Sequence, residues 1–259
     1  MKFFLRQTAA LVKLSFLELW RRNDVFALVL LALALMAPLS MATPFGAAGA
    51  SRCLDEVALL LVWAFSLFVS IGAGQRLFRP EFESRTVYPL FSKPVSRTRI
   101  LAGKYLGALA SAWSALALFY ALFTGSALLR GTGFGAALPQ AIALHAAFVA
   151  LAVALSLLGS LVMSASANST LCAIALAGMF FFGRRLPDFA AGAGGIVSWL
   201  VRAAYAIGPH AEFFDMRQRL VHGWGAIDPL AFAAVLAYAA AYTAALLCVA
   251  AAVLKRKRL

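Results

Sequence analysis

The sequence has little charge for its length. Only 13% of its 259 residues are Asp, Glu, Lys or Arg, whereas 63% are hydrophobic. Soluble domains average about 25% charged residues, so this shortage argues against a soluble domain. The charges also cluster, and the apolar runs between them are long enough to cross the ~30 Å hydrocarbon layer as helices. Because these runs do not alternate polar and apolar residues, a β-barrel is disfavoured. We expect an all-α polytopic membrane protein.

Cysteine and catalytic motifs are also scarce. Cys53, Cys172 and Cys248 lie far apart, without the spacing of a disulfide framework or a metal site. The chain has no His-Glu-x-x-His and no Gly-x-Ser-x-Gly sequence. Gly103-Lys104 is not a phosphate-binding loop, because the upstream glycine is missing and Tyr105 stands where Ser or Thr would reach magnesium. We therefore expect no metal, no cofactor and no enzymatic activity in this chain.

Six apolar stretches are predicted to span the membrane, within one permease domain over residues 1–259. The fifth stretch is short unless it recruits residues 165–169. A short loop holding Arg52, Asp55 and Glu56 is expected between the first two. Residues 1–22 carry a basic stripe beside an apolar face, which predicts an interfacial amphipathic helix. The predicted spans are about 25–44, 57–74, 105–129, 138–163, 170–182 and 230–254.

Lys and Arg are distributed unevenly along the chain. Of the 23, 16 fall in the amino-terminal segment, in residues 75–104 and in the basic tail 255–258. The remaining 7 fall in the other connections. An even number of spans puts both termini on one side, and the positive-inside rule makes that side cytoplasmic. The net charge of +13 is thus interpreted as a topology signal and not as a nucleic-acid surface.

Residues 183–229 are predicted to form two short extracytoplasmic or re-entrant helices. Ile196–Ile207 is apolar but too short to cross a membrane. Gly208-Pro209 then breaks the chain, and Pro209 is placed to start a second helix, on which Asp215 and Arg219 could pair across one turn. The segment is rich in aromatic residues, which favours a place in or on the outer leaflet. A loose extracellular loop is the alternative.

Polar residues inside or beside the spans are few. His145, in the fourth span, is interpreted as a neutral histidine bonded to a neighbouring helix, with a ligand contact or proton relay as the alternative. The group Arg184, Arg185 and Asp188 is interpreted as a helix-end anchor, or else as a site for an anionic headgroup. A tract of small polar residues suggests close packing with interhelical hydrogen bonds, or else the lining of a hydrated cavity. The tract comprises Ser156, Ser160, Ser164, Ser166, Asn168 and Ser169.

Residues 75–104 carry most of the functional information. Acidic, basic and apolar side chains follow one another in a fixed order, and Pro89 and Pro94 break the segment into short pieces. Ser96 can cap a helix that starts near Arg97. Gly103 and Gly107 share a face of that helix and permit close helix approach. Such a broken, charged element suits docking into a groove on a cytoplasmic partner. The alternative is a solvated loop whose basic residues only orient the chain.

This segment resembles the ABC-2 type permeases, the membrane subunits of a class of ATP-binding-cassette transporters. Pro89 is a departure, because members usually continue a helix there. The stretch from Tyr205 to Arg219 gives a second, weaker likeness to the region before the last span of some bacterial members. The matching residues in the segment are Glu81, Glu83, Arg85 and Thr86, then Ser92, Lys93, Pro94, Val95, Ser96 and Arg97, then Gly103, Lys104 and Gly107.

The resemblance implies a permease of the bacterial inner membrane that works beside a second permease, either an identical copy or a close relative. Two separate ATPase subunits would hold ATP and magnesium, and their closure would push on the coupling segment to export or extract a substrate. One alternative is mechanotransmission to an extracytoplasmic protein without solute transport; an intramembrane enzyme and a passive channel are the others. The residues expected to touch the ATPase subunit are Glu81, Glu83, Arg85, Thr86, Val87, Leu90, Phe91, Lys93 and Arg97.

Overall fold

The computed structural model describes residues 12–14, 16–17, 30–31, 34, 48–78 and 96–256, and every regular element within them is helical. Five helices there are long and apolar enough to cross a membrane. Most of the predicted first span at 25–44 and most of the predicted interfacial helix at 1–22 lie outside the described residues. The long helices are α3 (Ala48–Gln75), α6 (Arg97–Leu129), α7 (Ala137–Val162), α8 (Ala165–Phe182) and α12 (Pro229–Arg256).

These five helices occupy the places of the second to sixth predicted spans. The fifth does recruit residues 165–169, because Ser164 caps α8 by accepting a hydrogen bond from the Ala167 amide at 3.4 Å. One prediction was wrong. Arg52, Asp55 and Glu56 belong to α3 and not to a loop. Their helical conformation brings Asp55 to the Arg130 guanidinium at the far end of α6, and this ion pair offsets the cost of placing a carboxylate there.

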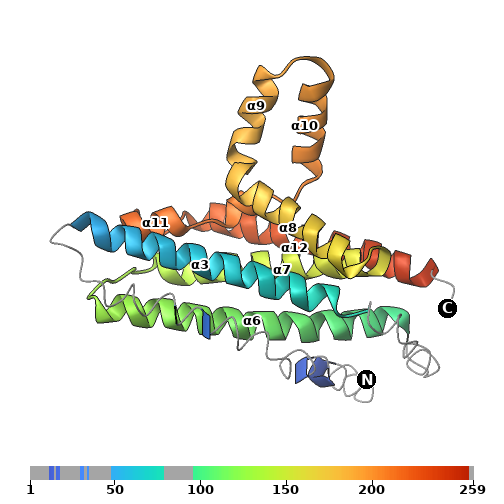
Figure 1. Cartoon of the computed structure of the whole chain (residues 1–259), viewed down its shortest axis with the longest axis horizontal. Helices are drawn as coiled ribbons and strands as arrows, with labels where there is room; N and C mark the ends of the chain where they lie inside the picture. Colours follow the sequence, from blue (N-terminus) through green and yellow to red (C-terminus); the bar gives the residue numbers. More distant parts are fainter. Residues whose placement is uncertain are drawn as a thin grey trace.

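α7 is the central helix of the bundle. It packs against α3, α6, α8 and α12, and its buried residues come from all around its circumference. In Figure 1, α3 and α7 run in one direction and α6 in the other, so the end of α3, the start of α6 and the end of α12 share one end of the bundle. α12 is largely uncovered, since only Ala239, Ala250 and Leu254 are buried along its length. Its exposed apolar surface suits lipid or another membrane subunit.

Close backbone approach holds α3, α7 and α8 together. A Cβ added at Gly74 would lie 2.7 Å from Ser156 Cβ, and one at Gly159 would lie 1.9 Å from Asn168 Oδ1. Ser156 donates to the Ile71 carbonyl of α3 at 2.8 Å, and Asn168 Nδ2 donates to the Ser156 carbonyl at 2.9 Å. The small polar tract therefore serves close packing and interhelical hydrogen bonds at these two positions, as the sequence predicted.

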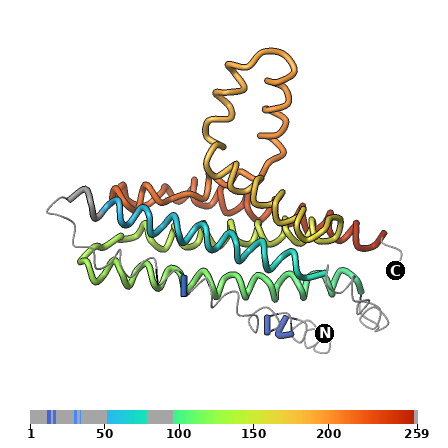
Figure 2. The backbone as a smooth tube through the Cα atoms, in the orientation of Figure 1, coloured from blue at the N-terminus to red at the C-terminus, as the bar shows by residue number. Residues whose placement is uncertain are grey.

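A helical hairpin stands out from the bundle after α8. It consists of α9 (Leu186–Gly192) and α10 (Gly195–Ile207), and Figure 2 shows it rising across the direction of the long helices. Gly195, with a φ of 61°, forms the turn. Ser198 on α10 donates to the Ala190 carbonyl on α9 at 2.6 Å and joins the two arms. α10 coincides with the apolar stretch Ile196–Ile207, whereas α9 was not predicted.

The chain returns from the hairpin into the bundle. A 3-10 turn, η1 (Gly183–Arg185), precedes the hairpin, while η2 (Ala211–Phe214) and α11 (Arg217–His222) follow it. η2 packs on α7 and α8, and α11 packs on α3 and α7, so this part is not a loose loop. The predicted pair of Asp215 with Arg219 is absent. Asp215 lies before α11 and so does not share a helical turn with Arg219; it instead accepts from the Arg217 backbone amide and from the Arg217 guanidinium at 3.0 and 3.1 Å. That guanidinium also stacks over the Phe180 ring at 4.5 Å.

Candidate functional site at the ends of α3, α6 and α12

α3 and α6 lie on either side of the predicted coupling segment, and the structure describes where the first ends and how the second begins. α3 ends at Gln75 and continues in turns through Phe78. α6 starts at Arg97 after Ser96, whose extended backbone is the N-cap, as predicted. The Ser96 side chain makes no capping bond; its hydroxyl lies 3.3 Å from Thr98 Oγ1 instead. The backbone carbonyl of Ser96 accepts the first helical bonds from the Arg99 and Ile100 amides.

Arg97 joins the end of the coupling segment to α12. Its Nη1 donates to the Leu254 carbonyl at 3.0 Å and to the Lys255 carbonyl at 3.3 Å. The last carbonyls of a helix lack partners within the helix and carry partial negative charge, so a guanidinium there is favourable. Sequence reasoning missed this contact. The two partners lie 157 residues apart, and no local pattern links them.

Lys104 fixes the other end of the segment. The side chain is buried, and its Nζ donates to the Leu77 carbonyl at 2.6 Å and lies 4.9 Å from the centre of the Phe78 ring. A buried ammonium requires such compensation, so this lysine ties α6 to the end of α3. Gly103 and Gly107 are also buried on α6, as close helix approach requires. The Gly-Lys-x-x-Gly motif is thus part of the contact between these helices.

Of the residues predicted to touch the ATPase subunit, only Arg97 is described. Arg97 lies at the end of the bundle that α3, α6 and α12 share. The chain leaves the bundle after Phe78 and re-enters it at Ser96, both at that end. Outside the described residues lie Glu81, Glu83, Arg85, Thr86, Val87, Leu90, Phe91 and Lys93.

His145 is at the polar centre of the bundle. Its Nε2 lies 2.7 Å from Ser66 Oγ on α3, and its Nδ1 lies 3.1 Å from the Tyr120 hydroxyl on α6. Ser66 already donates to the Trp63 carbonyl at 2.9 Å, so it accepts from Nε2–H, and Tyr120 then donates to Nδ1. This is a neutral histidine bonded to two neighbouring helices, as the sequence predicted, and the Trp63 ring stacks on it at 4.2 Å.

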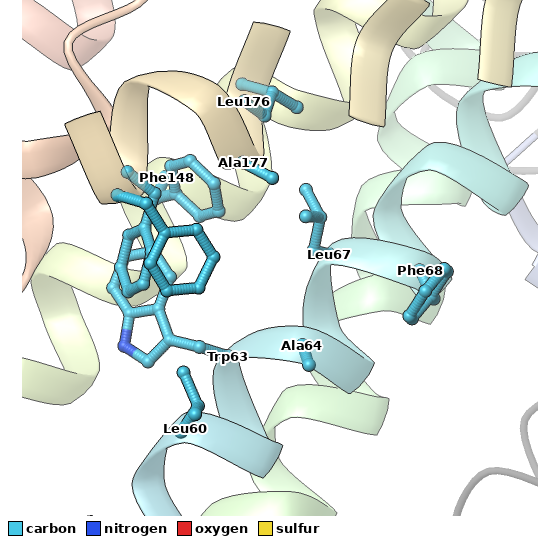
Figure 3. A pocket seen from close by; sticks show the side chains of 10 residues that line it. Leu60, Trp63, Ala64, Leu67, Phe68, Phe148, Leu176 and Ala177 are labelled. Atoms are coloured by element: carbon cyan, nitrogen blue, oxygen red, sulfur yellow. The ribbon is translucent and has the colours of Figure 1, made fainter. Parts of the chain in front are cut away.

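Beside His145 lies a cavity of about 210 Å³ between α3 and α8 (Figure 3). Trp63 and Phe148 form its inner wall, and both rings also contact His145. Every lining side chain is apolar apart from the Trp63 indole nitrogen, so the cavity offers hydrocarbon surface and no group for acid–base chemistry. The other lining residues are Leu60, Ala64, Leu67, Phe68, Leu176, Ala177, Phe180 and Phe181.

Residues 68–191 match the family model described as ABC-2 family transporter protein. The matched range begins within α3, runs through the coupling segment, α6, α7 and α8, and ends in α9. Residues 68–191 thus match an ABC-2 family transporter domain. Such a domain is the permease of an ABC transporter, a membrane component that works with a separate ABC ATPase subunit. No curated protein matches the chain.

The ABC-2 match confirms the resemblance that was drawn from residues 76–107, all of which fall within it. Together with the spanning helices, it makes this permease a multi-pass membrane protein. The part of the chain that follows the matched range holds α10, η2, α11 and α12, and it includes the Asp215–Arg217 pair and the carbonyls bound by Arg97. The tertiary structure therefore connects the ABC-2 region to residues beyond it.

Proposed function

We propose that this chain is the permease subunit of an ABC-2 type transporter, coupling ATP hydrolysis on two separate ATPase subunits to export or extraction of a substrate. The complex would contain a second permease, identical or closely related, and the ATPase subunits would hold ATP and magnesium. The observation that carries the proposal is the ABC-2 match across a segment whose two ends are tied into the bundle by Lys104 and Arg97.

The two ties suggest how force would pass from the ATPase. A displacement of residues 79–95 pulls on the Leu77–Lys104 contact at one end and on the Arg97–Leu254 contact at the other. The first contact moves α3 against α6, and the second moves α6 against α12. Because packed helices shift as rigid elements, a push at one end of the bundle changes how these helices meet along their length. That motion is the step that opens a route for the substrate.

The charge of this end favours a cytoplasmic position. Basic residues collect there, whereas acidic residues lie at the opposite end of α3 and before α12. The positive-inside rule then places the coupling segment and both termini in the cytoplasm of a bacterial inner membrane. The basic residues of this end that the structure describes are Arg76, Arg97, Arg99, Lys104, Lys255 and Arg256.

Mechanotransmission to an extracytoplasmic protein is the second candidate, and the α9–α10 hairpin is the observation that favours it. The hairpin stands apart from the bundle and exposes Ile196, Trp199 and Ile207, at 77%, 68% and 75% of their surface. A binding partner captured on the hairpin, without solute movement, would support this candidate over transport.

The experiment compares Phe91→Ala, Lys93→Ala and Glu83→Lys in the reconstituted complex, after expression and insertion are checked. An apolar anchor seated in a partner's groove commonly contributes more than about 1 kcal/mol, and a rim charge contributes less. Phe91→Ala should therefore weaken ATPase pull-down and substrate-linked ATP hydrolysis more than Lys93→Ala does. Glu83→Lys should act by placing like charges together. If all three variants assemble and couple normally, the segment does not dock on the ATPase subunit and only orients the chain in the membrane.

A further inference from the structure

The α9–α10 hairpin is attached to two different long helices. Its first arm, α9, follows α8 directly through η1. The end of its second arm is bound to α12, where the Tyr242 hydroxyl donates to the Ile207 carbonyl at 2.7 Å. Three residues later, the His210 amide donates to the Tyr238 hydroxyl at 3.1 Å. A shift of α12 relative to α8 would therefore move one arm of the hairpin against the other.

Ring contacts reinforce this attachment to α12. The centre of the Tyr238 ring lies 5.8 Å from that of His210 and 5.9 Å from that of Phe213. Tyr242 follows one helical turn later on the same face of α12, and its ring centre lies 5.7 Å from that of Tyr238. Aromatic pairs at such distances attract one another beyond the area that they bury. The two tyrosines thus hold the base of the hairpin by hydrogen bonds and by ring packing.

α12 is also bound at its start and at its end. Just before its start, Gln140 of α7 donates from Nε2 to the Ile227 carbonyl at 3.1 Å and accepts from the Ile227 amide at 2.7 Å. At its end, Arg97 of α6 donates to the Leu254 carbonyl at 3.0 Å. Between these contacts only three residues of α12 are buried, so few of its side chains interlock with the bundle and resist a shift.

These contacts give α12 the arrangement of a lever that turns about Ile227. At 1.5 Å per residue, the tyrosine pair lies roughly 16–23 Å from Ile227, and Leu254 lies roughly 40 Å from it. If α12 moves as a rigid element, a displacement of Leu254 moves the tyrosine pair by roughly half as much. The bond from Ser198 to the Ala190 carbonyl joins the two arms of the hairpin, so a pull at its base tilts the whole hairpin.

We propose that α12 is a lever that carries displacement of the coupling segment to the α9–α10 hairpin, and that Tyr238 and Tyr242 pass this displacement on. The lever rests on the proposed function, because its motion starts where the ATPase subunits push on residues 79–95. It gives the hairpin a movement in every ATP cycle. The two tyrosines act through the backbone of Ile207 and His210, so they are positioning residues.

The test measures two distances by pulsed electron–electron double resonance. The sample is the complete complex in nanodiscs, with cysteine-free ATPase subunits, before and after trapping with ATP, magnesium and vanadate. Spin labels on Ala165→Cys of α8 and on native Cys248 of α12 report the shift of α12 against α8; both positions are exposed. Labels on Ala165→Cys and Ala191→Cys report the hairpin, with Cys248→Ala.

Two details keep each measured distance within one chain. Cys53 is exposed and is changed to alanine in both label pairs, whereas Cys172 is buried and stays unlabelled. Labelled permease is diluted with unlabelled permease, so that pairs of labels within one chain dominate the signal.

Nucleotide should change both distances in the chain with native tyrosines. In the double variant Tyr238→Phe, Tyr242→Phe, both hydroxyls are lost and both rings remain. The hairpin change should then fall to less than half, while the α12 change stays the same. Tyr242→Ala, which also removes a ring, should have the same effect and keeps the test usable if the double variant does not assemble. Tyr205→Phe is the matched control, because the Tyr205 hydroxyl bonds Glu212 of η2, and it should alter neither change.

The results separate the lever from the function on which it rests. An undiminished hairpin change in both tyrosine variants would show that Tyr238 and Tyr242 only support the fold, and would overturn the lever. A complex in which nucleotide moves α12 but not the hairpin would also overturn it and leave the proposed function standing. If neither distance responds to nucleotide, the force path through Arg97 fails, and the lever fails with it.

Discussion

Replacing Gly159 with alanine should separate α7 from α8. The added Cβ would lie 1.9 Å from Asn168 Oδ1, far inside van der Waals contact. Asn168 would have to leave the position in which Nδ2 donates to the Ser156 carbonyl at 2.9 Å and Oδ1 accepts from Cys172 Sγ at 3.3 Å. Because α7 is the central helix, this contact supports the packing of α8 on the bundle.

The expected cost follows from two unfavourable terms and one favourable term. Overpacking by one methyl group commonly costs about 1–3 kcal/mol, and leaving a buried amide unpaired costs about 1–3 kcal/mol. Alanine gains about 1 kcal/mol over glycine within a helix. A net loss of about 2 kcal/mol corresponds to roughly 4–8 °C in the unfolding midpoint of a chain of this size.

The assay is thermal unfolding of the purified permease in one detergent, followed by tryptophan fluorescence. Gly178→Ala is the matched control, because a Cβ there meets nothing within 4 Å, and it should be neutral or slightly stabilising. In an Asn168→Ala background, Gly159→Ala should lose most of its effect, which gives a coupling energy of about 1–2 kcal/mol. Equal midpoints for Gly159→Ala and Gly178→Ala would refute the packing argument.

Three further outcomes follow from the structure and the sequence. Arg97→Gln should leave ATPase pull-down intact but reduce substrate-linked ATP hydrolysis, because it loses its hydrogen bonds to the α12 carbonyls. Arg202→Gln, at an exposed position, is the control and should change neither measurement. A failed pull-down for Arg97→Gln would place this arginine on the surface that contacts the ATPase subunit. Reporters fused after residue 259 and near Gly133 should report the cytoplasm and the outside, respectively, and a cytoplasmic Gly133 would reject the predicted topology. The isolated chain should hydrolyse no ATP, since it has no phosphate-binding loop, so ATPase activity that survives removal of every ATPase subunit would contradict this expectation.

The sequence alone determined the spanning helices of the described region. A membrane-spanning helix needs about 20 apolar residues, so it can be predicted from the length and composition of that stretch alone, without knowing which helices pack against it. The same holds for Gly103 and Gly107, whose spacing on one helical face predicts close packing without knowledge of the partner helix. His145 could be interpreted as neutral and bonded, since an unpaired charge within a span is costly.

Only the tertiary structure decided which residues meet. Ser66 and His145 are 79 residues apart, and Arg97 and Leu254 are 157 apart, so no helical periodicity relates them. Asp215 was expected to pair with Arg219 across a helical turn, but α11 starts only at Arg217, so Asp215 lies outside the helix and binds Arg217. The burial of Glu212 gave no signal in the sequence, because the room for its carboxylate depends on the absent side chain of Gly183, which lies 29 residues earlier in the chain.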